Sequence, residues 1–309
     1  MSLVRSALLW ASRNQRMERL VRSNSAMRPL VSRFMPGESL EDAIAAVRQL
    51  AGEATPTILT YLGENVATDA AAEQTVAEYD RLFAALKQSG ADAHVSIKLT
   101  QFGWDVDRGR ALDRVRRVAR TASASATILA VDMEGSPYVE STVDAYIDLA
   151  REFRNVALCI QAYLHRTPQD LQRLLVVKPY IRLVKGAYRE PGNVALQSRS
   201  AIDAQYRALA QQLLAATHQG ARVAFGTHDL DLVSQIRADA AQAGVPEKNL
   251  EIQMLYGIQD SGRRRLAADG LRTRVLISYG KAWYPWFMRR LAEKPSNLLF
   301  VARSFLPGS

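Results

Sequence analysis

The stretch Ile181-Arg-Leu-Val-Lys-Gly-Ala187 combines a short apolar run with polar and small residues at its end. A run of this length, rich in β-branched and apolar side chains, is typical of a buried strand. Seven other runs in the chain share the pattern. In chain order they occupy residues 56–63, 93–99, 127–133, 156–162, 222–228, 250–256 and 274–279.

Helical patterns separate these runs, as in the amphipathic stretches 70–89 and 202–218. Strands that alternate with helices predict βαβ units and parallel pairing. Eight such units favour a closed barrel over an open, doubly wound sheet. No G-x-G-x-x-G motif follows the first run, which argues against a dinucleotide-binding half of the Rossmann type. We therefore expect an α/β protein with a (β/α)8 barrel of the TIM type.

The first 50 residues precede the first strand and have helical patterns. Pro36-Gly37 followed by Ser39 marks a boundary there, because proline and glycine interrupt a helix and serine caps the next one. We expect a helical segment at residues 1–50 that packs on the barrel, and a catalytic barrel at residues 51–309.

Positive charge is concentrated at the N-terminus. Residues 1–35 hold seven arginines and one acid, Glu18, and so carry +6 of the formal net charge of +9. Three interpretations stay open: a transit peptide, an amphipathic helix that contacts an anionic membrane surface, and a solvated arginine face on a helix beneath the barrel. Nucleic acid binding is not expected, because the stretch has only Trp10 and Phe34 as aromatic residues and no recognised module.

Several kinds of chemistry lack support in the sequence. Cys159 is the one cysteine, so an intramolecular disulfide is impossible, and its apolar surroundings predict a small buried side chain in a reducing, cytoplasmic protein. The four histidines lack the spacing of a metal site, and no metal is expected. No serine lies in a G-x-S-x-G motif, which argues against hydrolysis by a catalytic triad.

Polar residues follow most of the predicted strands. Catalytic residues of such barrels lie at the carboxyl ends of the strands, which share one rim. Taken alone, Lys98 is also explained as a satisfied core lysine and Asp229 as a helix cap. Together the charges of both signs suit a small zwitterionic or anionic ligand. The residues at these ends are Glu64, Lys98, Asp132, Glu134, Gln161, Arg182, Lys185, Tyr188, Thr227, His228 and Asp229.

The last predicted helix carries Arg289 and Arg290 side by side, with Glu293 four and three residues later. Two adjacent guanidinium groups can hold one carboxylate by planar, bidentate hydrogen bonds. The alternative is a solvated arginine pair on the helix surface. The pair therefore predicts a carboxylate site only if the helix lies at the rim.

Several blocks of the sequence resemble those of proline dehydrogenases, in the expected order. The longest is Trp283-Tyr-Pro-Trp-Phe-Met-Arg-Arg-Leu-Ala-Glu-Lys-Pro-Ser-Asn297, and the next is Arg182-Leu-Val-Lys-Gly-Ala-Tyr188. Shorter blocks are Asp132-Met-Glu134, Gln161-Ala-Tyr163, Thr227-His228 and Leu255-Tyr-Gly257. The resemblance covers roughly residues 56–303 and is closest to the small monofunctional bacterial type.

The resemblance implies an enzyme that oxidises L-proline to 1-pyrroline-5-carboxylate with noncovalent FAD and passes electrons to a quinone. It implies that Arg289, Arg290 and Lys98 hold the substrate carboxylate, and that Glu64 pairs with Arg289 as a gate. Asp132, Tyr188 and Leu255 would shape the ring pocket, and Arg182 would lie near the flavin N5. The residues that would contact or orient FAD are Met133, Gln161, Arg182, Val184, Lys185, Gly186, Ala187, Thr227, His228 and Glu293. Asp132 and Arg182 are the expected catalytic residues.

One position departs from the family pattern. Proline dehydrogenases usually have tyrosine four residues before the glycine of strand eight, and proline two residues after that tyrosine. Here Leu276 and Ser278 occupy those positions. A second hypothesis is therefore the same flavin chemistry on 4-hydroxyproline or an N-substituted proline. A third is a barrel that binds a carboxylate without redox chemistry. A quinone acceptor would fit a cytoplasmic protein with peripheral contact at the inner membrane surface. The oligomeric state is not predicted.

Overall fold

The eight predicted strands form a closed parallel barrel. The computed structural model describes residues 8, 10–12, 14–23 and 27–293. Each strand pairs with the next, and β1 closes the barrel on β8. The strands are β1 (Thr57–Tyr61), β2 (Ala93–Ile97), β3 (Leu129–Val131), β4 (Val156–Gln161), β5 (Tyr180–Val184), β6 (Arg222–Gly226), β7 (Glu251–Leu255) and β8 (Arg272–Tyr279). The predicted (β/α)8 fold is confirmed.

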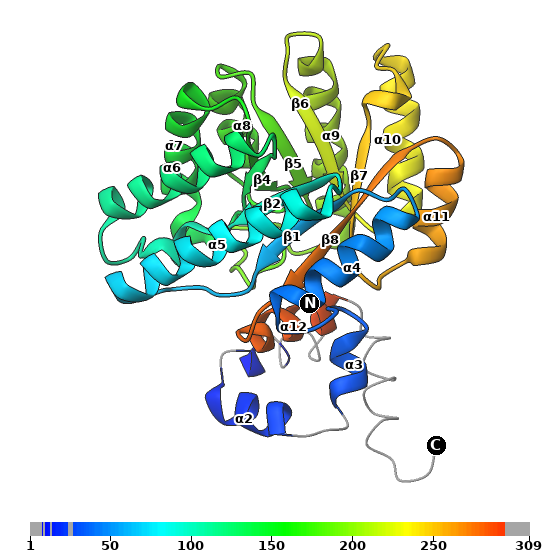
Figure 1. Ribbon diagram of the computed structural model, residues 1–309. Coiled ribbons are helices and arrows are strands. Elements are labelled where there is room, and N and C mark those ends of the chain that lie inside the picture. The colour runs from blue at the N-terminus through cyan, green and yellow to red at the C-terminus, as the bar shows by residue number, and fades with distance from the viewer. Residues whose placement is uncertain (1–7, 9, 13, 24–26, 294–309) are drawn as a thin grey trace.

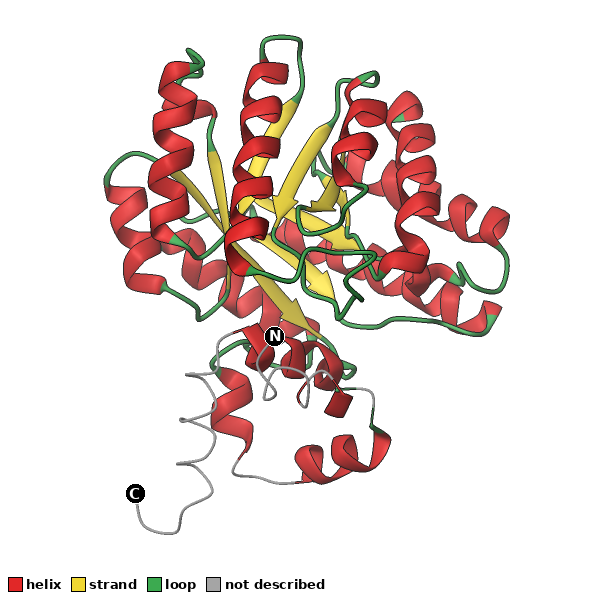
Figure 2. Cartoon of the chain, turned by 180° about the vertical axis from the view of Figure 1, so that it is seen from behind, coloured by secondary structure: helices red, strands yellow, loops and turns green. Residues whose placement is uncertain are grey.

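Helices cover the outside of the barrel (Figure 2). The predicted stretches 70–89 and 202–218 correspond to α5 and α9. The helices that follow β1 to β7 are α5 (Asp69–Ser89), α6 (Arg108–Ala124), α7 (Val139–Glu152), α8 (Thr167–Leu175), α9 (Arg199–Thr217), α10 (Leu230–Gln242) and α11 (Asp260–Ala268). Their apolar faces and the outward side chains of the strands form one continuous core.

The helix α4 (Leu40–Gly52) occupies a place in this outer ring. It begins at the predicted boundary, where Ser39 accepts a hydrogen bond from the Asp42 amide and Asp42 accepts one from the Ser39 amide. The helix packs against β1, β8 and α5, between α5 and α11 (Figure 1). Because α4 covers β8 from outside, the helix that follows β8 has to lie elsewhere.

That last helix, α12 (Trp283–Glu293), lies at the end of the barrel to which the strands point. It packs on α2 (Gln15–Ser23) and α3 (Arg28–Ser32) in a second apolar cluster that includes Phe34 and Phe287. Their rings meet edge to face at a centroid distance of 5.9 Å. The N-terminal helices therefore support α12 from outside. None of the described helices combines the length and the apolar character needed to cross a membrane.

The inside of the barrel changes character along its axis. Towards the amino ends of the strands, the small side chains of Ala130, Ala157 and Ala224 leave room for Tyr180. Arg274 is also buried inside the barrel and has no exposed surface. Arg274 forms ion pairs of 3.1 Å with Glu251 and 3.0 Å with Asp92. Buried arginine needs such partners, because its charge loses the solvation of water. This layer closes the bottom of the barrel, and the space above it is open.

Gly257 joins the barrel to the N-terminal helices. Its φ of +69° is in the left-handed region, and a Cβ atom there would overlap the carbonyl oxygen of Arg33. Gly90 provides a matched control, because its φ is +65° and a Cβ atom would meet nothing within 4 Å.

We predict that Gly90→Ala lowers the free energy of unfolding by about 1–2 kcal/mol, the cost of the left-handed backbone alone. Gly257→Ala should cost about 1–3 kcal/mol more, because the new methyl group must displace backbone. Urea denaturation of both variants measures the difference. Equal decreases in the free energy of unfolding of the two variants would show that Gly257 does not pack against the backbone of Arg33.

Candidate active site

A cavity of about 980 Å³ opens at the carboxyl ends of the strands. This size lies at the upper end of the range for ligand and cofactor sites. Most residues expected in the site line it: Lys98, Asp132, Met133, Gln161, Arg182, Val184, Lys185, Gly186, Ala187, Tyr188, Thr227, His228, Leu255, Arg289 and Arg290. Glu64 does not line the cavity but contacts Lys98 and Arg289, which do. The side chain of Glu293 is outside the described residues.

Arg182 forms part of the cavity floor. It is ion-paired with Asp132 and donates to the hydroxyl of Ser96 at 3.2 Å. Its Nη1 has no hydrogen-bond partner among the described residues, and neither has Oε1 of the neighbouring Gln253. Burial lowers the pKa of Arg182 to about 10. The floor thus presents a buried cation and an unused donor and acceptor, which a polar ligand could satisfy.

One wall of the cavity comes from β4 and β5. Gln161 donates to the backbone carbonyl of Glu134 at 2.9 Å and accepts from the amide of Ala187 at 3.4 Å. Gly186, which directly precedes Ala187, has a φ of +127°. A Cβ atom at this position would overlap the ring of Tyr163. Glycine is therefore required for the backbone of β5 to turn along the cavity.

The next part of the wall, from the end of β5 to the end of β7, is organised by charge and by one histidine. Lys185 lies 2.5 Å from a carboxylate oxygen of Asp203 and 3.0 Å from one of Asp229. Asp229 also caps α10, as one interpretation of the sequence expected. His228 accepts the amide hydrogen of Leu255 on Nε2 at 2.8 Å. Its ring is therefore the neutral tautomer with hydrogen on Nδ1.

Glu64 links the rim of the barrel to α12. Its Oε1 lies 3.0 Å from Lys98 and 2.7 Å from Arg289. Burial would raise the pKa of Glu64, but the two cations outweigh burial and lower it to about 2. The predicted pair between Glu64 and Arg289 is present, and Lys98 is a second partner of the same oxygen.

The underside of α12 faces the cavity. The guanidinium of Arg289 lies 5.1 Å from the ring centroid of Tyr188, and that of Arg290 lies 5.9 Å from the ring of Trp286. Lys98 is only 7% exposed and Arg289 is 9% exposed. The roof therefore places three cationic side chains, Lys98, Arg289 and Arg290, along one side of the cavity.

Sequence reasoning missed several residues of the cavity. Gln253 lies two residues before Leu255 on the same face of β7, so strand alternation was a signal for it. Thr60 on β1 and Cys159 on β4 could be found in the same way. Asp203 lies on α9, and no motif indicated it. Cys159 is buried as expected, and burial raises the pKa of its thiol to about 12.

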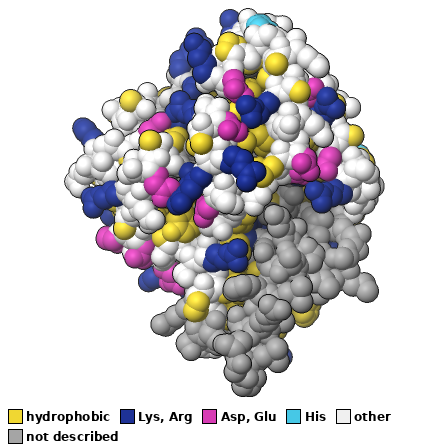
Figure 3. All heavy atoms as spheres, turned by 90° about the vertical axis from the view of Figure 1, so that its right-hand side faces the viewer, with side chains coloured by type: hydrophobic (Ala, Val, Ile, Leu, Met, Phe, Trp, Pro, Cys, Tyr) yellow, Lys and Arg dark blue, Asp and Glu magenta, His cyan; other side chains and the backbone are white. Residues whose placement is uncertain are grey.

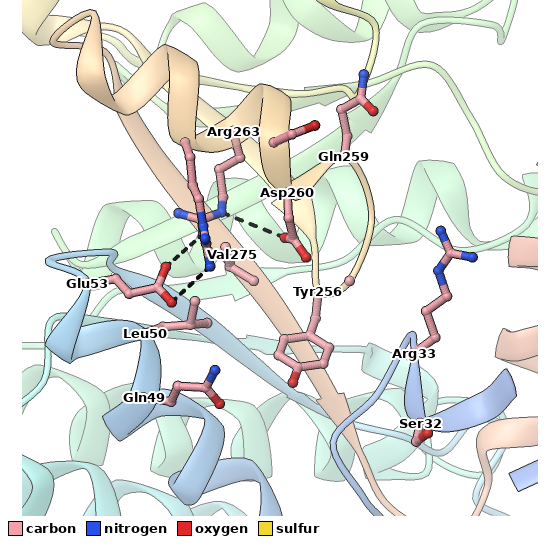
Figure 4. A pocket seen from close by; sticks show the side chains of 13 residues that line it. Ser32, Arg33, Gln49, Leu50, Glu53, Tyr256, Gln259, Asp260, Arg263 and Val275 are labelled. Carbon is pink, nitrogen blue, oxygen red and sulfur yellow. Dashed lines mark hydrogen bonds and ion pairs between the residues drawn. The ribbon is translucent and has the colours of Figure 1, made fainter. Parts of the chain in front are cut away.

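A second cavity, of about 540 Å³, lies outside the barrel between α4 and α11 (Figure 4). Its buried arginine, Arg263, donates to Thr55 at 2.8 Å and to Glu53 at 3.1 Å, and Glu53 also pairs with Arg264 at 3.2 Å. The rim cavity is larger, and most of the residues expected in the site line it. It is therefore the better candidate for a carboxylate site.

Comparison with known proteins agrees with this geometry. A family model described as proline dehydrogenase matches residues 43–303. The chain is 34% identical over 311 residues to the proline dehydrogenase of Deinococcus radiodurans, with 99% of each chain covered. It is 32% identical over 305 residues to proline dehydrogenase 1 of Bacillus subtilis subsp. natto, covering 98% of this chain and 99% of that one. The chain belongs to the proline dehydrogenase family.

Solved structures support the fold of this proline dehydrogenase family member. Proline utilization A of Bdellovibrio bacteriovorus superposes with a TM-score of 0.82 at 22% sequence identity, covering 97% of this chain and 39% of that chain. The chain thus spans well under half of that larger protein. With relatives of its own length at 32–34% identity, it is an oxidoreductase of proline catabolism.

Removal of the Glu64 charge should destabilise the protein in a pH-dependent way. The pKa of Glu64 is lowered in the folded state. Its contribution to the free energy of unfolding is therefore present above pH 4.5 and is lost as the pH falls towards 2. We predict that Glu64→Gln lowers the free energy of unfolding by ~2 kcal/mol at pH 7, which is less than the loss expected when a fully buried ion pair is broken. The difference from the unmodified protein should shrink below pH 4.5.

Urea unfolding at a series of pH values measures this effect. Glu140→Gln is the control, because the Glu140 side chain is 67% exposed and should contribute little. A Glu64→Gln deficit that stays constant from neutral to acid pH would contradict the ion-pair assignment.

Proposed function

We propose that the rim cavity binds FAD noncovalently and oxidises L-proline to 1-pyrroline-5-carboxylate, with electrons passed to a quinone. The observation that carries the proposal is the position of α12. It brings Arg289 and Arg290 over the same cavity whose floor holds Arg182. The groups proposed to bind the carboxylate and to face the flavin would therefore lie on opposite sides of one space.

The residues present fit a flavin. The orphaned Nη1 of Arg182 and Oε1 of Gln253 are buried polar atoms that a heteroaromatic ring with donors and acceptors would satisfy. When bound, FAD supplies the electron acceptor for a hydride from the substrate. The residues proposed to hold it are Met133, Gln161, Arg182, Val184, Lys185, Gly186, Ala187, Thr227 and His228, all in the cavity lining, with Glu293 from α12.

The substrate carboxylate is proposed to bind Arg289, Arg290 and Lys98. Glu64 already pairs with two of these cations, so the incoming carboxylate competes with it or shares them. Exchange of one carboxylate for another keeps the local charge nearly constant. Glu64 then acts as a gate that occupies the cations until substrate arrives. Such fixed placement of a substrate beside an acceptor lowers the barrier to reaction by orientation.

The substrate ring is proposed to lie among Asp132, Tyr188 and Leu255. Asp132 is held by Arg182, and the backbone of Leu255 is held by His228. Burial raises the pKa of Tyr188, so its hydroxyl stays protonated and can donate a hydrogen bond. These contacts would give the ring pocket two polar walls and one apolar wall.

The first test is spectroscopic. Purified protein should be yellow, and its flavin absorbance should bleach on anaerobic addition of L-proline. Pyrrolidine lacks the carboxylate and should leave the absorbance unchanged, because it cannot use the α12 arginines. A colourless protein that cannot be reconstituted with FAD would rule the proposal out, as would equal bleaching by pyrrolidine.

A substituted proline is a second candidate substrate, because Leu276 lines the cavity where the family usually has tyrosine. Leu276 pairs in register with Leu255 of the ring pocket. Thr60, on the adjacent strand β1, also lines the cavity, and its hydroxyl has no hydrogen-bond partner among the described residues. A ring substituent with a hydroxyl group would find space at Leu276 and a partner at Thr60.

We predict that Leu276→Tyr raises the ratio of kcat/KM for L-proline over that for 4-hydroxyproline by about tenfold or more, because the larger side chain fills the space for a substituent. Leu276→Met conserves volume and should leave the ratio unchanged. Steady-state rates on both substrates measure it. If the unmodified protein strongly prefers L-proline and the tyrosine leaves the ratio unaltered, the second candidate is excluded.

A further inference from the structure

The loop between β5 and α9 buries one acidic side chain. Arg189 and residues 191–193 are exposed, whereas Glu190 between them is only 8% exposed. On the face shown in Figure 3, by contrast, Asp and Glu side chains lie at the surface, several of them beside Lys or Arg. Glutamate is seldom buried, because its charge loses the solvation of water and has to be satisfied by other contacts. The contacts of Glu190 therefore indicate its role.

Both carboxylate oxygens of Glu190 are used by one residue, Ser136, which follows β3. Oε1 accepts the amide hydrogen of Ser136 at 2.7 Å, and Oε2 accepts the hydroxyl hydrogen at 2.6 Å. We refer to these two hydrogen bonds as the Ser136 latch. Pro191 follows Glu190 directly and restricts the backbone of Glu190 to extended conformations. The latch therefore joins the loop after β5 to the loop after β3 with little freedom.

Tyr188 lies two residues before Glu190 and packs beside the latch. A Cβ atom on Gly135, the residue before Ser136, would lie 3.5 Å from Oε1 of Glu190 and 4.0 Å from Cδ1 of Tyr188. The Tyr188 ring thus rests against the same backbone that the latch holds. The guanidinium of Arg289 lies 5.1 Å from the centroid of that ring. Within the described part of the chain Tyr188 itself makes no hydrogen bond, so its neighbours determine where the ring lies.

The second half of the same loop is held without the latch. The amide of His165 donates to the carbonyl of Val194 at 3.0 Å, and the amide of Leu196 donates to the carbonyl of Tyr163 at 2.8 Å. These bonds attach this half of the loop to the loop after β4. Loss of the latch should therefore loosen the stretch around Tyr188 and leave the rest of the loop in place.

We propose that Glu190 is a positioning residue for the substrate ring. By holding Ser136, it keeps the Tyr188 ring against Gly135 and beside Arg289, so that the ring pocket has its shape before substrate binds. A wall that is already in place needs no ordering when the ligand arrives, and this strengthens binding. The proposal rests on the proposed place of Tyr188 in the ring pocket, whereas the latch itself does not depend on the reaction.

A purely structural role is the alternative. The Ser136 amide begins the short helix η3 (Ser136–Tyr138), which leads into α7, and Gly135 before it has no side chain to cap that helix. Glu190 supplies the missing cap. A cap contributes to stability wherever it occurs, so a loss of stability does not separate the two roles. A change in substrate affinity that depends on Tyr188 does separate them.

The test is steady-state oxidation of L-proline with a soluble electron-accepting dye. Glu190→Ala should raise KM about tenfold and change kcat little, because a pocket wall contacts the substrate ring in the ground state and the transition state alike. In the Tyr188→Ala background the same change should raise KM by less than about twofold, because that wall is already gone. An unchanged KM, or an equal rise in both backgrounds, would overturn the proposal.

Two further variants keep the test decisive if Glu190→Ala folds poorly. Glu190→Gln keeps one acceptor for the Ser136 amide, and its own amide can donate to the Ser136 hydroxyl, so KM should stay near that of the unmodified protein. Ser136→Ala removes the hydroxyl but keeps the backbone bond, and it should raise KM about threefold. A rise of about tenfold for Glu190→Gln, or no rise for Ser136→Ala, would overturn the proposal.

Asp107→Ala is the matched control. Asp107 is exposed and caps α6, where it accepts the amide hydrogen of Arg110 at 3.0 Å. Its removal should lower the free energy of unfolding, as the loss of a cap does, and leave KM for L-proline unchanged. A rise in KM as large as that of Glu190→Ala would show that the loss of any cap has this effect, and would overturn the proposal.

Hydrogen exchange of the ligand-free full chain separates this proposal from the proposed function. The backbone amides of residues 187–190 should exchange faster in Glu190→Ala than in Asp107→Ala, because this part of the loop opens locally without the latch. Unchanged exchange would overturn the latch, whatever the activity. Faster exchange in a protein that does not oxidise L-proline would support the latch and overturn the proposed function.

Discussion

The carboxylate of Glu64 holds Lys98 and Arg289 together, and the position of α12 over the barrel depends on that shared ion pair. Without an anion between them, two cations that are each less than a tenth exposed would repel one another in a poorly solvated space. Glu64 follows β1, Lys98 follows β2, and Arg289 lies on the last helix. One carboxylate therefore joins the start and the end of the barrel at the rim where a ligand would enter.

The second constraint is the place of α4 in the outer ring. Because α4 packs on β8 from outside, α12 is displaced onto the open end of the barrel, and its apolar side needs another cover. The helices α2 and α3 supply that cover. The N-terminal segment thus has two tasks in the fold: α4 completes the ring, and the helices before it hold the roof of the site. Val21 of α2 packs on this cluster, whereas Arg16, Arg19 and Leu20 of the same helix are exposed.

Much of this architecture could be predicted from residue patterns, because strands and helices of a (β/α)8 barrel bury alternating or periodic faces. Gln161 could be predicted because it ends an apolar run, and Arg182 because it lies within one and matches the family pattern. The ring position of α4 could not be predicted, since amphipathic spacing shows that a helix has a buried face but not which strands it covers. Asp203 escaped notice for a similar reason: its contact with Lys185 spans α9 and β5 and leaves no local signal. The contact of Glu64 with both Lys98 and Arg289 could not be predicted, because the three residues lie far apart in the sequence.

The central claim is that α12 holds the substrate carboxylate above the floor of the barrel. A crystal structure with a proline analogue in which oxygen replaces the ring nitrogen tests it most directly, because the analogue keeps the carboxylate and cannot be oxidised as an amine. We expect the carboxylate to contact Arg289, Arg290 and Lys98, with the ring beside Tyr188 and Leu255. A carboxylate bound in the outer cavity at Arg263, or directed away from α12, would contradict it.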